Sequence, residues 1–146
     1  MISVDLQGHL AVVTGGAGQI GRVICKTLAK AGCHVAVHYF HGQQRAEELA
    51  KTLQEEYGIC SAAFQADVSK LDQVHTMQQQ ICEQLGNPDI IVNGAVVQYD
   101  WKSLLEQDTK DYISQFESCV PVSYTHLDVY KRQGSQRLVQ MNVIML

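Results

Sequence analysis

The sequence lacks the signals that would place it among disulfide-bonded, metal-binding, membrane or nucleic-acid-binding proteins. Its five cysteines are scattered without a C-x-x-C pair, so no disulfide framework is expected. Of its six histidines, His34 and His38 are four residues apart, but they fall on an expected strand rather than on a helix, so no metal site is expected. No apolar run approaches the roughly 18 residues of a membrane span, and the first ten residues lack the charged start and apolar core of a secretory signal. A formal net charge of -4 provides no basic field for nucleic acid. We therefore expect a cytoplasmic protein with no nucleic-acid or membrane partner.

Short apolar runs alternate with longer helical patterns up to about Val120, which is typical of a parallel α/β sheet. The expected strands are Leu10–Val13, a run that begins at Val35, Ala62–Ala66 and Ile90–Val92. Helices are expected between them, with a fourth from about Asp108. Right-handed crossovers then predict a three-layer, Rossmann-type, doubly wound parallel sheet of about four strands in the order 3-2-1-4. The sheet is incomplete in this prediction, and its fourth strand lies at an edge.

Apolar residues recur at helical spacing in each of the first three expected helices. They are Ile20, Val23, Ile24, Leu28 and Ala31 in the first, Ala46, Leu49, Ala50 and Leu53 in the second, and Val74, Met77, Ile81 and Leu85 in the third. The cysteines between them are expected to pack as small core residues.

Three of the four glycines in the segment TGGAGQIG, which starts at Thr14 and joins the first strand to the first helix, have the G-x-x-G-x-x-G spacing. Gly15 allows a tight turn, Gly18 allows the backbone to approach a pyrophosphate, and Gly21 allows close packing of helix on strand. The helix N-terminus then offers free N–H groups and a positive dipole to the phosphates. Because the turn follows an expected strand and opens an expected helix, the context favours dinucleotide binding over a purely structural turn.

Three segments together resemble the short-chain dehydrogenase/reductase superfamily: VTGGAGQIGR at the glycine turn, ADVS from Ala66, and DIIVNGA from Asp89. The resemblance runs from about Val4 to Val120, the N-terminal half of that family. It implies hydride transfer between NAD(P)(H) and a carbonyl or hydroxyl group, a small-molecule substrate, and a homo-oligomeric parent. It also implies adenine contacts at Asp67 and Val68, and ribose contacts at the end of the fourth strand. With the glycine turn, the expected cofactor-binding residues are Thr14, Gly15, Gly18, Gln19, Ile20, Gly21, Tyr39, His41, Asp67, Val68, Asn93, Gly94 and Ala95.

The sequence departs from the family pattern at three places, one of which is Cys119, where the family usually has an asparagine on the following helix. Gln19 stands where single-domain members have a further glycine, and the resulting G-x-x-G-x-x-G spacing matches the longer, epimerase-like branch. The segment N-N-A-G is reduced to N-G-A-V at Asn93. An epimerase-like protein and a non-catalytic NAD(P)-binding sensor therefore stay open as alternatives.

The end of the second expected strand reads HYFH, from His38 to His41, and contains no carboxylate. An acidic residue there would accept the ribose 2′-hydroxyl and select NAD. We expect His38, His41 and Arg45 to meet a 2′-phosphate instead, the alternative being that the histidines are solvated loop residues. The missing acid favours NADP over NAD.

No catalytic residue can be assigned in this chain. The family uses a tyrosine and a lysine four residues later, which share one helix face, and no lysine here has a tyrosine at that spacing. The segment from Val122 to Gln133, VSYTHLDVYKRQ, resembles translated sequencing-adapter read-through. We therefore divide the chain into a partial NAD(P)-binding domain, residues 1–120, and an artefactual or irregular tail, residues 121–146. The chain as written is expected to be inactive, and a genuine truncated or divergent protein is the alternative.

Overall fold

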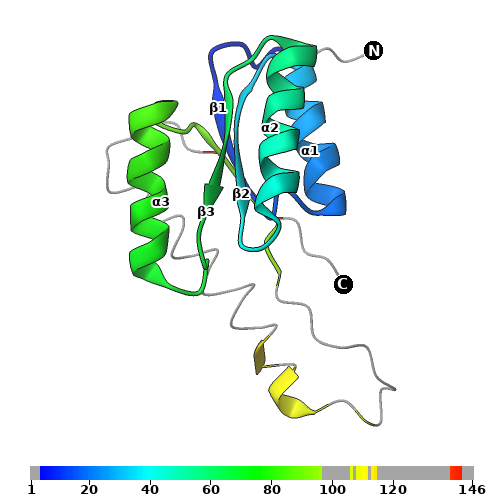
Figure 1. Ribbon diagram of the computed structural model, residues 1–146, viewed down its shortest axis with the longest axis vertical. Helices are drawn as coiled ribbons and strands as arrows, with labels where there is room; N and C mark the ends of the chain where they lie inside the picture. Colours follow the sequence, from blue (N-terminus) through cyan, green and yellow to red (C-terminus); the bar gives the residue numbers. More distant parts are fainter. Residues whose placement is uncertain (1–3, 97–105, 107, 112, 115–138, 143–146) are drawn as a thin grey trace.

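The structure is a computed structural model and describes residues 4–96, 106, 108–111, 113–114 and 139–142 (Figure 1). The elements in chain order are β1 (Leu10–Thr14), α1 (Gln19–Lys30), β2 (His34–Tyr39), α2 (Gln43–Tyr57), β3 (Ser61–Gln65), α3 (Leu71–Gln84), β4 (Ile90–Asn93) and β5 (Val139–Asn142). Residues 109–111 and 113–114 are helical, as expected, and the remainder of the fourth predicted helix lies outside the described residues. The adapter-like segment from Val122 to Gln133 also lies outside them.

The strands form one parallel sheet in the order β3-β2-β1-β4-β5. The predicted order 3-2-1-4 is confirmed. β1 is the central strand, and its Val13 lies opposite Val37 of β2 on one side and Val92 of β4 on the other. Continuous apolar runs form these inner strands because helices cover both faces of the sheet.

The expectation that β4 lies at an edge of the sheet was wrong. β5 pairs with it in parallel, with Val139 opposite Ile90 and Asn142 opposite Asn93. The residues of β5, VQMN, alternate between apolar and polar, which is the strand pattern that the sequence prediction overlooked in this short segment.

The two faces of the sheet carry separate apolar cores. α1 and α2 cover one face and α3 covers the other (Figure 1). Val13, Val35 and Val37 pack in the core on the α1 and α2 side, whereas Val12 and Ala36, the residues between them, pack on the α3 side. Side chains along each strand therefore alternate between the two cores. Because the strands are parallel, their carboxyl ends lie at the same edge, where the first turns of α1 and α2 begin. None of the described helices is both long enough and apolar enough to cross a membrane.

The predicted apolar faces of α2 and α3 are confirmed, whereas that of α1 is confirmed only in part, through Ile24 and Leu28, which pack against the core. Ile20 and Val23 are 46% and 64% exposed, and the buried residues of α1 are small: Gly21, Cys25 and Ala29. Small residues let the helix axis approach β1 closely, because a helix can lie only as near to a sheet as its side chains allow. The prediction that cysteines are core residues holds for Cys25 and Cys33, while Cys60 is exposed.

Candidate functional site

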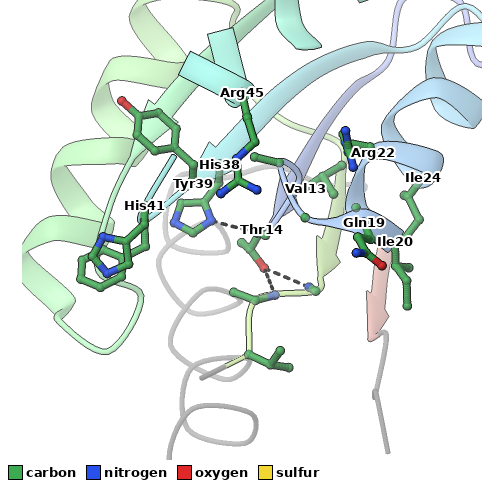
Figure 2. Close-up of a pocket in the computed structure, with 18 residues that line it drawn as sticks. Val13, Thr14, Gln19, Ile20, Arg22, Ile24, His38, Tyr39, His41 and Arg45 are labelled. Carbon is green, nitrogen blue, oxygen red and sulfur yellow. Dashed lines mark hydrogen bonds between the residues drawn. The ribbon is translucent and has the colours of Figure 1, made fainter. Parts of the chain in front are cut away.

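A pocket of about 590 Å³ opens at the carboxyl ends of β1, β2 and β4, beside the first turn of α1 (Figure 2). In open α/β sheets this edge is where ligands bind. The pocket brings together ten of the thirteen predicted cofactor residues: Thr14, Gly15, Gly18, Gln19, Ile20, Gly21, Tyr39, His41, Gly94 and Ala95. They come from segments up to about 80 residues apart in sequence, as the Thr14–Gly94 hydrogen bond illustrates.

Two of the three glycines occupy positions where no side chain fits. Gly15 has a φ of +68°, and a Cβ there would lie 2.7 Å from the carbonyl oxygen of Gly94. A Cβ on Gly21 would lie 2.2 Å from the carbonyl oxygen of Gly15. The turn is therefore clamped between the β4 loop and the first turn of α1, and glycine is required for both close approaches.

The N-terminus of α1 faces the pocket without a side-chain cap. Gly18 is the N-cap residue, no side chain caps it, and the first turn contains no acidic residue. The first intrahelical hydrogen bond runs from the Arg22 amide to the Gly18 carbonyl at 3.0 Å. The amides of Gln19, Ile20 and Gly21 precede that bond, so they and the helix dipole can serve an anion in the pocket.

Thr14 joins the glycine turn to the loop after β4. Its hydroxyl accepts hydrogen bonds from the amides of Gly94 at 3.0 Å and Ala95 at 3.2 Å, and it donates to the carbonyl of Val92 at 3.4 Å. Figure 2 shows the two amide bonds as dashed lines. Thr14 is 1% exposed, so it acts on the pocket by fixing the position of these two backbone groups.

His38 does not meet a 2′-phosphate, and the expectation that it would was wrong. Its ring is buried, and both ring nitrogens are engaged with backbone groups: Nδ1 with the amide of Gly15 at 3.0 Å and Nε2 with the carbonyl of Ala66 at 2.9 Å. Burial lowers the pKa of His38, and the Ala66 carbonyl opposes that shift in part. The ring belongs to the scaffold beneath the pocket.

The side chains around the pocket give it a positive character. Arg22, Arg45 and His41 line it, and none of the described residues that line it is a carboxylate. The guanidinium of Arg45 lies against the backbone at Gly42, since a Cβ placed there would be 2.9 Å from its Nη2. No three His, Cys, Asp or Glu side chains gather as a metal site would require within the described part of the chain. This arrangement suits an anionic organic ligand.

Sequence reasoning did not select Arg22 or Phe40, which also line the pocket. Arg22 directly follows the last glycine of the turn, and its position one helical turn from Gly18 was the available signal. Phe40 follows the buried Tyr39 and is 46% exposed, with its ring centroid 4.1 Å from that of His41. Phe40 could not have been selected from the sequence, because a single apolar residue at the end of a strand does not indicate a binding site.

The structure does not bring Asp67, Val68 and Asn93 into the pocket lining. The Asp67 carboxylate accepts from the hydroxyl and the amide of Ser69 at 2.6 and 3.0 Å, which together with Lys70 holds its pKa below the usual value. Asp67 therefore orders the loop between β3 and α3. Asn93 is 9% exposed at the end of β4, opposite Thr14 in the register. The cofactor contacts of these three residues stay predictions.

The family model of short chain dehydrogenases matches residues 9–144 and so extends through β5. The chain is 42% identical over 92 residues to an acetoacetyl-CoA reductase of Allochromatium vinosum, a match that covers 63% of this chain and 37% of that protein. It is 43% identical over 94 residues to the short-chain dehydrogenase/reductase homolog YusS of Bacillus subtilis, covering 64% and 85%. It is 30% identical over 121 residues to a 3-oxoacyl-(acyl-carrier-protein) reductase FabG of Staphylococcus aureus, covering 76% and 49%. The chain thus spans half or less of the length of the two named reductases.

Solved structures show the same likeness. A short-chain dehydrogenase/reductase of Serratia marcescens superposes with a TM-score of 0.76 at 30% identity, covering 87% of this chain and 51% of that one. A short-chain type dehydrogenase/reductase of Mycobacterium marinum superposes with a TM-score of 0.80 at 24% identity, covering 94% and 56%. The second likeness supports the fold alone.

Proposed function

The chain belongs to the short-chain dehydrogenase/reductase family, and we propose on that premise that it is the nucleotide-binding half of an NAD(P)-dependent oxidoreductase. The intact parent would transfer hydride between a nicotinamide cofactor and a carbonyl or hydroxyl group, and the bound nicotinamide would supply the hydride chemistry. Residues of this chain would bind and orient the dinucleotide. The supporting observation is the clamped glycine turn beneath an uncapped helix N-terminus, in a pocket whose charged lining side chains are basic.

Each part of the pocket has a chemical counterpart in a dinucleotide. The amides of Gln19, Ile20 and Gly21 are suited to a pyrophosphate, because phosphate oxygens accept from free N–H groups at the positive end of a helix dipole. The absence of side chains at Gly15 and Gly21 lets the turn pack closely on the Gly94 carbonyl and on the start of α1, which fixes the backbone beside those amides. The backbone of Gly94 and Ala95, fixed by Thr14, forms the opposite wall, where the family resemblance places the ribose of the nicotinamide half.

We further propose that NADP is preferred to NAD. The acidic residue that would select NAD is absent from the end of β2, and His41 and Arg45 line the pocket there. His38 no longer contributes to this argument, since its ring nitrogens are engaged elsewhere. A guanidinium held against Gly42 is well placed for a 2′-phosphate, for which arginine is the preferred partner.

The test is calorimetric titration of the chain with NADPH and with NADH, for the wild type, Arg45→Gln and Lys51→Gln. Both substitutions remove one positive charge from α2, but Lys51 is exposed, pairs with Glu55 and does not line the pocket. A charge-assisted hydrogen bond contributes about 1.5–3 kcal/mol, so Arg45→Gln should weaken NADPH binding roughly 10- to 150-fold and leave NADH binding unchanged. Lys51→Gln should change neither by more than about twofold. Tighter binding of NADH by the wild type would refute the NADP preference, and binding of neither nucleotide would refute the proposed function.

The chain as written lacks the Tyr-x-x-x-Lys pair, and we propose that it binds cofactor without carrying out proton transfer. The same absence is the feature that favours the alternative function, a non-catalytic NAD(P)-binding sensor. Two relatives are named as reductases of 3-oxoacyl thioesters, so acetoacetyl-CoA is the first carbonyl substrate to offer with NADPH. Turnover by the chain would refute the inactivity. A cytoplasmic location and assembly of the parent into a homo-oligomer belong to the same proposal and rest on the family resemblance.

A further inference from the structure

The imidazole of His38 spans two loops that flank the pocket. The residue lies near the end of β2 and is 2% exposed. Its Nδ1 is 3.0 Å from the amide nitrogen of Gly15, the first glycine of the turn (Figure 2). Its Nε2 is 2.9 Å from the carbonyl oxygen of Ala66, which directly follows β3. Its main-chain carbonyl also accepts from the amide of Gly16 at 3.0 Å. Side chain and main chain of one residue therefore hold two successive amides of the glycine turn.

These partners allow the ring only one protonation state. A carbonyl oxygen can only accept, so Nε2 must carry the hydrogen that is donated to Ala66. A backbone amide can only donate, so Nδ1 must present a lone pair to Gly15. The ring is therefore the neutral Nε2–H tautomer. In the imidazolium form Nδ1–H would point at the Gly15 N–H, and two donors would face each other in a buried site.

We infer that His38 is a positioning residue that shapes the glycine turn only while its imidazole is neutral, so that protonation of His38 and nucleotide binding oppose each other. The nucleotide part of this inference rests on the proposed function. If Gly15 loses its acceptor, its amide must turn to find another, and Gly15 is the residue against which both Gly94 and Gly21 are packed. A displacement of Gly15 therefore displaces the amides at the start of α1.

The charged neighbours of His38 come from three elements. Arg22 of α1 and Arg45 of α2 line the same pocket, as do Tyr39 and His41 beside it on its own strand and the loop that follows. Asp67 follows Ala66 in the loop after β3, with its carboxylate engaged by Ser69. Burial lowers the pKa of the ring from its usual value of about 6.5, so the ring is neutral at pH 7 and accepts its proton under acidic conditions.

The strand offers a matched control at its other end. His34 also accepts a backbone amide at Nδ1, that of Cys60 at 3.0 Å, but it lies at the amino edge of the sheet and does not line the pocket. Substitution of each histidine by asparagine removes one titrating group and keeps a side-chain acceptor. Comparison of His38→Asn with His34→Asn therefore distinguishes an effect on the glycine turn from the general effect of losing a histidine in β2.

The experiment is calorimetric titration with NADPH between about pH 5 and pH 8 for the wild type, His38→Asn and His34→Asn. Loss of affinity linked to one proton reaches at most about tenfold per pH unit. The readout is the difference between the wild-type and His38→Asn curves, because the 2′-phosphate of the ligand titrates in the same range. The wild type and His34→Asn should lose additional affinity on acidification that His38→Asn does not lose. Coincident curves for the wild type and His38→Asn would overturn the inference.

A second measurement does not depend on the nucleotide. Nitrogen-15 NMR of the ligand-free chain should show His38 as the Nε2–H tautomer at pH 7, and the Gly15 amide resonance should shift together with the titration of that ring. An Nδ1–H tautomer, or a Gly15 amide that ignores the titration, would overturn the inference even if His38→Asn did not fold. If no nucleotide bound at any pH, the proposed function would fail, and the NMR result would still decide the role of His38.

Discussion

Replacing Thr14 by valine would test how the pocket is held together. Valine keeps the branched shape of threonine and removes only the hydroxyl, which accepts from the amides of Gly94 and Ala95 and donates to Val92. An unsatisfied buried donor costs about 1–3 kcal/mol. Both amides are partly buried, so water can reach them in part and the lower half of that range applies to each. We expect Thr14→Val to lower the free energy of unfolding by about 2–4 kcal/mol.

Urea denaturation followed by circular dichroism measures this loss, provided that the slope of the transition is unchanged. The control is Thr27→Val on α1, where the hydroxyl donates to the carbonyl of Val23 at 2.8 Å on an exposed surface. That bond can be replaced by water, so the control should lie within about 0.5 kcal/mol of the wild type. Thr14→Ser keeps the hydroxyl and should recover most of the loss. If Thr14→Val were no less stable than Thr27→Val, the anchoring role of Thr14 would be refuted.

Three further results are expected. Gly21→Ala places a methyl group 2.2 Å from the Gly15 carbonyl oxygen and should cost more than about 3 kcal/mol in stability and abolish nucleotide binding; a melting temperature equal to that of the wild type would contradict the clamped turn. Because burial lowers the pKa of His38 in the folded state, the unfolded chain binds more protons, so stability should rise with pH between the folded-state pKa and about 6.5. The slope is at most about 1.4 kcal/mol per pH unit, and urea titrations that show the same slope for His38→Asn would exclude it. Leu53→Ala, at a fully buried position of α2, should cost about 2–5 kcal/mol, whereas Val23→Ala at a 64% exposed position should cost less than about 1 kcal/mol, and equal losses would be inconsistent with the core.

The elements that could be predicted from the sequence are those whose signal is local. The runs at Leu10 and Ile90 are uniformly apolar because both faces of their strands are covered, and the glycine turn is defined by residues within one short segment. The apolar face of α1 was predicted only in part, because the fully buried residues of the helix are the small ones, Gly21, Cys25 and Ala29. Two of the predicted larger residues, Ile20 and Val23, are exposed. A prediction from hydrophobic periodicity gives most weight to large apolar side chains. A helix that packs closely on a sheet buries small side chains instead.

The parts of the site that could not be predicted depend on neighbours distant in sequence. A histidine at the end of a strand has the same local signal whether it faces solvent or, like His38, satisfies groups on Gly15 and Ala66. The strand β5 was missed for a different reason: its residues alternate between apolar and polar as a strand does, but the alternating run in Val139–Asn142 is only four residues long. For His38 the deciding interactions are hydrogen bonds to backbone groups of other segments.

The central position of β1 has a consequence for the order of folding. Thr14 and its partner Gly94 are 80 residues apart, so the contact that completes the pocket closes one of the longest loops in the described chain, and such contacts form late. During synthesis from the N-terminus, β1, α1 and β2 leave the ribosome long before the loop after β4 is available to pack against Gly15. The proposed nucleotide can therefore stabilise the finished sheet by mass action, but it finds no complete pocket in the nascent chain. Early folding relies on the apolar core beneath α1 and α2 alone.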